Sequence, residues 1–303
     1  MQFLDVKTDF AFKKVFGSDQ SKDILIDFLN ALIDFEDETI TDVTIVDPYQ
    51  IPLLKGMKDS YVDVKAILSN QKTVIIEMQV LNVEGFEKRV LYNAAKTYST
   101  QLRKAESYES LEPIIALTIT DFVMFEELSS IISYWNLREK EQFIKYSDDI
   151  ELIFIELPKF KKTEPELTTI SDKWIYFIKH AGELEFIPKT FTEPPLVEAF
   201  AFANTAGLSE EELELQFKRR DFIFLQKGAL EKARKDGRRE GIQEGIQEGI
   251  QAGIQEGIQA GIQEGKQQEK LDMARRMVKD QVPVEMIIKY TGLRQEEVEN
   301  IEN

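Results

Sequence analysis

Two runs of alternating apolar residues constrain this chain more than any other feature of its sequence. The runs read SYVDVKAIL at 60–68 and TVIIEMQVL at 73–81, and only the turn-forming residues SNQK separate them. Since successive side chains of a strand point to opposite faces, the pattern predicts a β-hairpin with one apolar face that must be buried. The side chains expected on that face are Val62, Val64, Ala66, Leu68, Val74, Ile76, Met78 and Val80.

The other face of the predicted hairpin is acidic. Asp63 lies on its first strand, and Glu77 and Gln79 lie on its second. Because both apolar faces must point the same way, the register can slip only in steps of two residues. Asp63 is therefore expected opposite Glu77 or one step away, and a three-residue loop at 69–71 would pair the two directly.

Two carboxylates in such positions need to be neutralised. The Cβ atoms of directly opposed residues lie about 4.5 to 5.5 Å apart, where like charges repel. A bound cation, the nearby Lys65 or protonation of one carboxylate would relieve the repulsion. Mg²⁺ is commonly held by one or two carboxylates together with water and substrate phosphates, so the pattern is compatible with a divalent-metal site. A solvated polar strand face without a ligand is the alternative.

The segments around the hairpin predict a sheet covered by helices. Apolar residues at helical spacing predict one helix over 21–33 and another over 84–104. The second helix is expected to have one apolar and one basic face. The residues expected on its basic face are Lys88, Arg89, Lys96 and Arg103.

Short apolar segments predict further strands. A strand-like stretch at 43–46 precedes the hairpin, and continuous apolar runs at 114–119 and 152–157 are typical of strands covered on both sides. Residues 170 to about 230 are expected to be mostly helical. The order helix, three strands, helix, strand indicates an α/β layer fold with a mixed sheet flanked by helices.

Histidine and cysteine are almost absent, since His180 is the single histidine and there is no cysteine. Zinc fingers and thiol enzymes are thereby excluded, and histidine catalysis is disfavoured. Any chemistry on nucleic acids would depend on carboxylates and a hard cation. The formal charge of −17 disfavours DNA binding on average, although local basic faces can exist. His180 itself is expected to end a helix.

The chain has no pattern of export or membrane insertion. No stretch approaches the roughly 18 uncharged apolar residues that would span a bilayer, and MQFLDVKTDF at the N-terminus lacks the pattern of a signal peptide. A lack of cysteine is typical of a compartment where disulfides are not used. We therefore expect a cytoplasmic protein without a membrane partner.

A glycine occupies every fourth position from Gly237 to Gly265, mostly within the unit Gly-Ile-Gln-Glu or Gly-Ile-Gln-Ala. Each glycine costs a helix about 1 kcal/mol relative to alanine, so an isolated helix would be marginal and only close packing with a partner would offset the cost. The isoleucines from Ile242 to Ile262 repeat every four residues, longer than the about 3.6 residues of a helical turn, which favours a right-handed supercoil. We expect a homo-oligomer built through this tail, and a flexible low-complexity spacer is the alternative.

The last residues, 283–301, predict two short helices around Thr291 and Gly292. A helix-turn-helix that reads DNA fits this pattern, and a small helical hairpin for self-association fits so acidic an end at least as well. The expected organisation is a main domain with a helical extension at 1–233, a repeat linker or helix at 234–268, and a small helical hairpin at 269–303.

Several motifs together resemble a known group of proteins. Asp63, followed after thirteen residues by EMQ at 77–79 inside an apolar strand, resembles the Asp…(Asp/Glu)-x-Lys signature of the PD-(D/E)XK nuclease superfamily. More specifically, the chain is similar to the recombination-promoting nuclease and transposase family of that superfamily. Supporting stretches are DFAFKKVFG at 9–17 and KRVLY at 88–92, and the glycine repeat is also a feature of that family.

The resemblance implies a restriction-endonuclease-like mixed sheet flanked by helices, with a C-terminal helical or repeat tail. It also implies cleavage of DNA in recombination or in mobile elements, with Mg²⁺ or another divalent cation such as Mn²⁺ or Ca²⁺. Asp63, Glu77 and Gln79 would then be the catalytic residues, with the metal on Asp63 and Glu77 and with Gln79 in the place of the superfamily lysine. Glutamine can orient a water but cannot deprotonate it near neutral pH, so the metal would lower the pKa of that water.

Two basic residues are candidates for binding substrate. Lys13 and Arg89 could hold phosphates or a carboxylate, although Lys13 could instead pair with Asp9. Asp9 could reach the metal region from the first helix, but we expect it to cap that helix. Two other functions remain open. The protein could be a catalytically weak or inactive DNA-associated scaffold that assembles through its tail. A transposase with three carboxylates would need a later acidic residue, for which Asp121 is the candidate.

Overall fold

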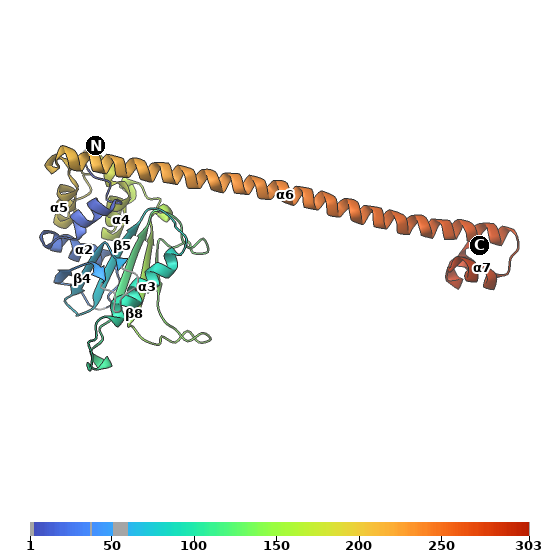
Figure 1. Ribbon diagram of the computed structural model, residues 1–303, viewed down its shortest axis with the longest axis horizontal. Helices are drawn as coiled ribbons and strands as arrows, with labels where there is room; N and C mark the ends of the chain where they lie inside the picture. Colours follow the sequence, from blue (N-terminus) through green and yellow to red (C-terminus); the bar gives the residue numbers. More distant parts are fainter. Residues whose placement is uncertain (1–2, 37, 51–59, 303) are drawn as a thin grey trace. The chain divides into compact units, whose positions relative to one another are not determined.

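The computed structural model describes residues 3–36, 38–50 and 60–302. The chain divides into two compact units, Met1–Gly228 and Ala229–Asn303. The first unit is built on a six-stranded sheet with the order β1-β4-β5-β6-β8-β7 (Figure 1). The strands of this sheet are β1 Val43–Val46, β4 Val64–Leu68, β5 Thr73–Gln79, β6 Ile114–Thr120, β7 Ile132–Trp135 and β8 Ile150–Glu156, and a separate pair consists of β2 Tyr49–Gln50 and β3 Ser60–Tyr61.

The sheet is mixed, as predicted. β4 is antiparallel to both β1 and β5, whereas β5, β6 and β8 are parallel to one another and β7 is antiparallel to β8. The carboxyl ends of the three parallel strands therefore meet at one edge of the sheet, called the carboxyl edge below, where Gln79 pairs with Thr120 and Thr120 with Glu156. β7 was not predicted from the sequence.

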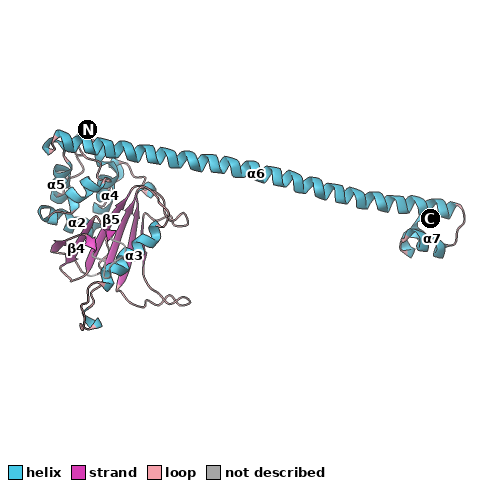
Figure 2. Cartoon of the chain, in the orientation of Figure 1, coloured by secondary structure: helices cyan, strands magenta, loops and turns pink. Residues whose placement is uncertain are grey.

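Helices cover both faces of the sheet (Figure 2). In the first unit these are α1 Asp9–Phe16, α2 Lys22–Leu32, α3 Phe86–Ser99, α4 Ile170–His180 and α5 Pro194–Ala203. The first unit also contains the start of α6 Glu210–Lys279. Short 3-10 turns lie at Asp19–Ser21, Tyr108–Ser110, Leu157–Lys159, Glu164–Glu166, Ala181–Glu183 and Thr205–Gly207. α3 packs against β6 and β8 on one face, and α1, α2, α4 and α5 bury their apolar sides in the main core on the other. The predicted α/β layer fold is confirmed.

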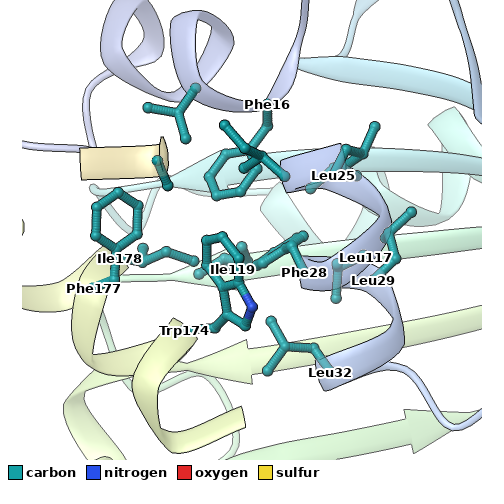
Figure 3. Close-up of a cluster of buried hydrophobic side chains, with 14 of the residues drawn as sticks. Phe16, Leu25, Phe28, Leu29, Leu32, Leu117, Ile119, Trp174, Phe177 and Ile178 are labelled. Atoms are coloured by element: carbon teal, nitrogen blue, oxygen red, sulfur yellow. The ribbon is translucent and has the colours of Figure 1, made fainter. Parts of the chain in front are cut away.

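The main core is rich in aromatic rings (Figure 3). Phe28 of α2 lies with its ring centroid 4.6 Å from that of Phe16 and 5.6 Å from that of Trp174 on α4. All three side chains are fully buried. Large aromatic side chains contribute most to core stability per residue, so this cluster fixes α1, α2 and α4 onto the sheet.

The predicted hairpin is present, with one correction. Val64 pairs with Ile76, and the Leu68 amide donates to Lys72 O at 2.9 Å across the predicted three-residue loop. Val62, however, does not share the buried face of Val64 and packs instead in the cluster on the α3 side, with Ile75. The prediction was wrong because the chain bends at Asp63 and β4 begins only at Val64, so the alternation does not extend back to position 62.

The predicted basic face of α3 is also only partly correct, and the helix ends at Ser99 rather than near 104. Arg89 turns toward β5, as described below. Lys96 is 5% exposed and its ammonium donates to Gln50 O at 2.8 Å. A lysine can be buried when its aliphatic stem packs on apolar surface and its charged head finds oxygen partners.

The second unit contains the rest of α6 together with α7 Val284–Thr291 and α8 Gln295–Glu302. Ala274, Ile287, Leu293 and Val298 form its buried cluster. Gly292 ends α7 with a φ of 67°, a left-handed conformation that glycine adopts without strain. The two short helices predicted around Thr291 and Gly292 are confirmed.

The glycine repeat belongs to α6 and is helical in the structure. A Cβ added at any glycine from Gly237 to Gly265 would have no neighbour within 4 Å beyond the adjoining turns of the helix itself. The isoleucines from Ile242 to Ile262 are each between 53% and 58% exposed. Among the residues that the structure describes, no helix is long and apolar enough to cross a membrane.

Candidate functional site

Asp63 and Glu77 come together at adjacent ends of β4 and β5. The pairing of Val64 with Ile76 puts Asp63 and Glu77 at the next positions of the two strands. The Asp63 amide donates to Ile76 O at 3.0 Å, and its carboxylate accepts a hydrogen bond from the Met78 amide at 2.8 Å. The Asp63 carboxylate thus lies against the backbone that flanks Glu77, in the arrangement that the hairpin pattern predicted.

A lysine from α1 faces Asp63. The ammonium of Lys13 lies 3.5 Å from Asp63 Oδ1. Asp9 does not compete for this lysine, because it pairs with Arg219 of α6 at 3.2 Å. Asp9 is also not the cap of α1, since Thr8 occupies the N-cap position and Asp9 is the first helical residue. The expected cap and the pairing with Lys13 were therefore wrong, and Lys13 belongs to the acidic site. The negative charge of Asp9 adds to the rise that burial causes in the pKa of Asp63, which supports the alternative that Asp9 reaches the region of the site.

Arg89 of α3 joins Glu77 to Gln79. Its Nη2 atom donates to Glu77 Oε1 at 2.5 Å and to Gln79 Oε1 at 2.7 Å. The amide nitrogen of Gln79 donates in turn to Leu81 O at 2.7 Å. Both ends of the Gln79 amide are thus engaged within the protein, and Arg89 brings a positive charge to the place where glutamine has none.

Asn93, one turn after Arg89 on α3, was not singled out from the sequence. It is 1% exposed, and its amide lies close enough to Glu77 to lower the pKa of that carboxyl. Neither polar atom of its side chain has a hydrogen-bond partner among the described residues. The sequence feature that could have identified Asn93 is its position in the apolar stripe of α3, between Val90 and Ala94, where a polar residue is unexpected.

The protein environment acts against full ionisation of the acidic pair. Burial raises the pKa of Asp63, while the Met78 amide and the Lys13 ammonium oppose the shift. Burial also raises the pKa of Glu77, Arg89 opposes this shift, and the negative charge of Asp63 adds to it. Each carboxylate therefore influences the other, and a further cation between them would favour the charged forms.

Lys65 was considered as a neutralising residue for this pair. Burial lowers the pKa of Lys65, and the charge that opposes this shift is that of Asp47. The basic groups that contact the two carboxylates are Lys13 and Arg89 instead. These residues come from α1 and α3, so the pattern of the hairpin alone could not predict them as partners of the carboxylates.

The donor set fits a hard cation that keeps part of its water shell. Within the described ranges, no group of three or more His, Cys, Asp or Glu side chains is placed to hold a metal ion. Mg²⁺ needs only one or two protein carboxylates, because waters and substrate phosphates complete its coordination. Asp63 and Glu77 supply two carboxylates, and both are shifted toward protonation in the absence of a nearby divalent charge.

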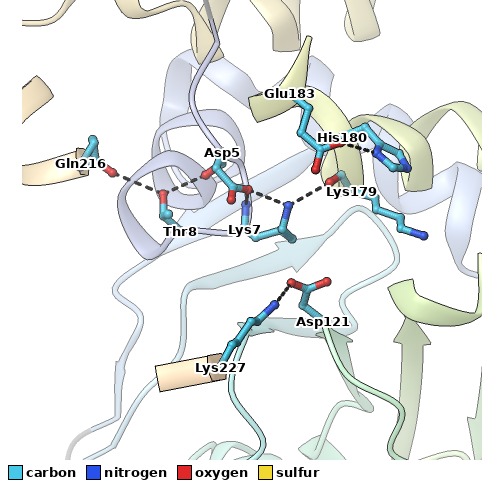
Figure 4. A network of polar contacts seen from close by, with 9 residues as sticks. All are labelled: Asp5, Lys7, Thr8, Asp121, Lys179, His180, Glu183, Gln216 and Lys227. Atoms are coloured by element: carbon cyan, nitrogen blue, oxygen red, sulfur yellow. Dashed lines mark hydrogen bonds and ion pairs between the residues drawn. The ribbon is translucent and has the colours of Figure 1, made fainter. Parts of the chain in front are cut away.

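Asp121 lies next to the site but is differently engaged (Figure 4). Its amide donates to Gln79 O at 2.9 Å at the carboxyl edge, and its carboxylate forms an ion pair with Lys227 of α6. The same view contains His180, the last residue of α4 as predicted, whose Nδ1 lies 2.9 Å from Glu183 Oε2. Asp121 therefore has a cation of its own, whereas His180 lies in a local contact between neighbouring turns.

The fold and this site define a class of protein. A mixed sheet flanked by helices, with an acidic pair on adjacent strands, is the architecture of the PD-(D/E)XK nucleases. The family model described as PD-(D/E)XK nuclease family transposase matches residues 6–233, and the chain belongs to this family. Neither the curated proteins nor the solved structures contain a significant match to the chain. Nucleases of this superfamily generally use divalent metal ions, and membership indicates a nuclease-like function on DNA.

Proposed function

We propose that this protein is a divalent-metal-dependent DNA endonuclease in which Asp63 and Glu77 hold the metal ion. The observation that carries the proposal is the pair of largely buried carboxylates, one just before β4 and one in β5, each with a raised pKa and each facing one cation. Such a pair is unfavourable by itself and becomes favourable when a divalent ion binds. Family membership of residues 6–233 supports the same conclusion.

Each residue of the site would have a distinct role in the proposed reaction. A bound Mg²⁺ or similar ion supplies a Lewis acid for the scissile phosphate and lowers the pKa of a coordinated water. Asp63 and Glu77 orient the ion, and the Met78 amide holds Asp63 in place. Lys13 and Arg89 are partly exposed cations beside the carboxylates, and both can bind phosphate oxygens of DNA. Gln79 accepts from Arg89 and donates to Leu81, so its role is to position the arginine.

We also propose that the protein assembles as a homo-oligomer through its repeat, within an organisation of main domain 1–233, repeat 234–268 and helical hairpin 269–303. A helix with this many glycines is marginal alone, since each costs about 1 kcal/mol relative to alanine. The open space beside each glycine and the exposed isoleucines support a second helix as the missing stabiliser. A role in recombination or mobile elements and a cytoplasmic location are the biological setting that we infer from the family and from the lack of cysteine.

Isosteric substitutions test the nuclease proposal. In Asp63→Asn and Glu77→Gln, Mg²⁺-dependent nicking of supercoiled plasmid is expected to fall by at least about a hundredfold, more than the loss of an outer partner of a metal ligand costs. The melting temperature of each metal-free variant should not fall, because a buried charge is removed. Nicking equal to that of the wild type in both variants would refute the proposal.

Asp121→Asn is the matched control for these two variants. Asp121 is also an acid at the carboxyl edge, but it is paired with Lys227 and is assigned no metal here. Nicking by Asp121→Asn should remain within a few-fold of the wild type. A loss as large as that of Glu77→Gln would instead support a site with three carboxylates.

A further inference from the structure

Arg89 and Asn93 form a polar pair on the inner side of α3. They are separated by four residues, which places them one above the other on the same face of a helix. That face also carries the buried Val90 and Ala94, which pack toward the sheet. Both polar side chains lie at Glu77: Arg89 makes the ion pair, and the Asn93 amide, like Arg89, opposes the rise that burial causes in the pKa of the carboxyl.

The unpaired state of Asn93 is costly. A buried polar group without a hydrogen-bond partner destabilises the folded state by about 1 to 3 kcal/mol. Other buried polar residues of α3 avoid this cost: Thr97 donates to Asn93 O and accepts from Gln50, and Lys96 donates to Gln50 O. Asn93 is therefore placed poorly for stability, as is expected of a group whose intended partner is held by another residue until a ligand binds.

Arg89 and a divalent ion would compete for Glu77. The guanidinium already occupies Glu77 Oε1, and a metal ion on the same carboxylate would repel it. Arg89 is partly exposed, Nη2 is its hydrogen-bonding atom at Glu77 and Gln79, and its Nε has no hydrogen-bond partner among the described residues. A metal ion on Glu77 would weaken this contact and favour a turn of the guanidinium toward a phosphate. Once it turns away, the carboxylate needs another donor to keep its orientation.

We propose that Asn93 is a positioning residue that holds the Glu77 carboxylate after a divalent cation has displaced Arg89 from it. Its amide is neutral, so it can donate to Glu77 without competing electrostatically with the metal. Its short side chain is fixed by burial, which makes it a more rigid support than the long arginine. This inference rests on the proposed function of Glu77 as a metal ligand.

The test uses the full chain and Mn²⁺ as the probe. Asn93→Leu replaces the amide by an apolar group of similar size, and its Mn²⁺ affinity, measured by calorimetry without DNA, is expected to fall about tenfold to a hundredfold. Its melting temperature in the presence of a chelator should equal or exceed that of the wild type, because the unpaired amide is gone. A purely structural asparagine would give the opposite pattern, with lower stability and unchanged affinity, and that result would overturn the proposal.

Thr97→Val is the matched control, one turn further along α3. Thr97 is buried and fully hydrogen-bonded, so this variant should lose stability and keep its Mn²⁺ affinity. If leucine at position 93 prevents folding, Asn93→Ala must show the same loss of affinity, and wild-type affinity in that variant overturns the proposal. Glu77→Gln distinguishes failure of the metal site from failure of the positioning role. If this variant binds Mn²⁺ like the wild type, the metal site itself is refuted. If only Asn93→Leu keeps the wild-type affinity, the positioning role of Asn93 alone is refuted.

Discussion

β5 and the glycine repeat of α6 are both regular segments, but their surroundings are opposite. In β5 every side chain is buried or partly buried between α3 and the main core, and both neighbouring strands are paired in register. In the repeat, residues 237–265, every side chain is exposed and no glycine has a neighbour beyond its own helix. The strand is thus specified by contacts within the chain, whereas the side chains of the helical repeat are exposed and its glycines meet no neighbour beyond the helix.

The largest expected difference is between the effects of core and repeat substitutions on the free energy of unfolding. Phe28→Ala removes a fully buried ring that packs on Phe16 and Trp174, and we expect a loss of about 3 to 5 kcal/mol in the free energy of unfolding. Ile254→Ala removes an exposed side chain and should change the monomer by no more than about 0.5 kcal/mol. Urea unfolding of dilute protein, followed by fluorescence and by circular dichroism, measures both. Equal losses would mean that the repeat is packed within the chain, contrary to the comparison.

Alanine substitutions at one glycine of the first unit and at one glycine of the repeat should change the stability of the protein in opposite directions. A Cβ at Gly182 would lie 2.8 Å from Asp5 Cα, so Gly182→Ala should cost about 1 to 3 kcal/mol through overpacking. Gly253→Ala meets open space and should stabilise an unpaired helix by about 1 kcal/mol. Thermal unfolding of the two variants gives the signs.

Self-association provides the second measurement on Gly253→Ala. If a second helix packs against the repeat as proposed, the added methyl groups in Gly249→Ala with Gly253→Ala should weaken the oligomer, as seen by sedimentation. Unchanged mass with higher helix content would show that the glycine stripe is not the contact surface.

The smallest expected effect is a pH dependence confined to the acidic pair at β4 and β5. Burial raises the pKa of Asp63 and Glu77, so folding without metal shifts both groups toward protonation. The stability they confer is complete below the ordinary carboxyl pKa and is lost as the pH rises through the raised values. Glu77→Gln should therefore be slightly more stable than the wild type at neutral pH and equal to it in acid. Melting temperatures across that range, without metal, test this, and a stabilisation found only in acid would have the wrong sign.

The repeat, which is rich in glutamate, provides a control for the role of burial. Its carboxylates are exposed to water, which screens their charges. At neutral pH a matched Glu248→Gln variant should differ from the wild type by no more than about 0.5 kcal/mol, as is usual for an exposed side chain. A stabilisation as large as that of Glu77→Gln would contradict the assignment of the effect to burial.

Local patterns predicted the central part of the fold well. Alternation gave the hairpin and its loop, continuous apolar runs gave β6 and β8, and helical spacing gave α2. Burial of one face is enough to fix register, so the opposition of Asp63 and Glu77 followed from the same pattern. Where the chain bends, at Asp63, this logic failed and Val62 was assigned to the wrong side.

The rest of the site depends on contacts between distant parts of the chain. Arg219 and Asp9 are 210 residues apart and Lys227 and Asp121 are 106 apart, and no local period encodes such pairs. The inward turn of Arg89 is equally non-local, because a helical wheel places a charged residue outside by default and cannot anticipate an acid on the strand beneath it.

The bridge from Arg89 to Glu77 and Gln79 makes positions 79 and 89 interdependent. A lysine introduced at position 79 would meet a guanidinium already in place, so the pocket would hold two positive charges against one glutamate. Arginine on the helix and lysine on the strand are therefore alternatives rather than additions. To convert one arrangement into the other, a positive charge introduced at position 79 of β5 must be accompanied by removal of the positive charge at position 89 of α3.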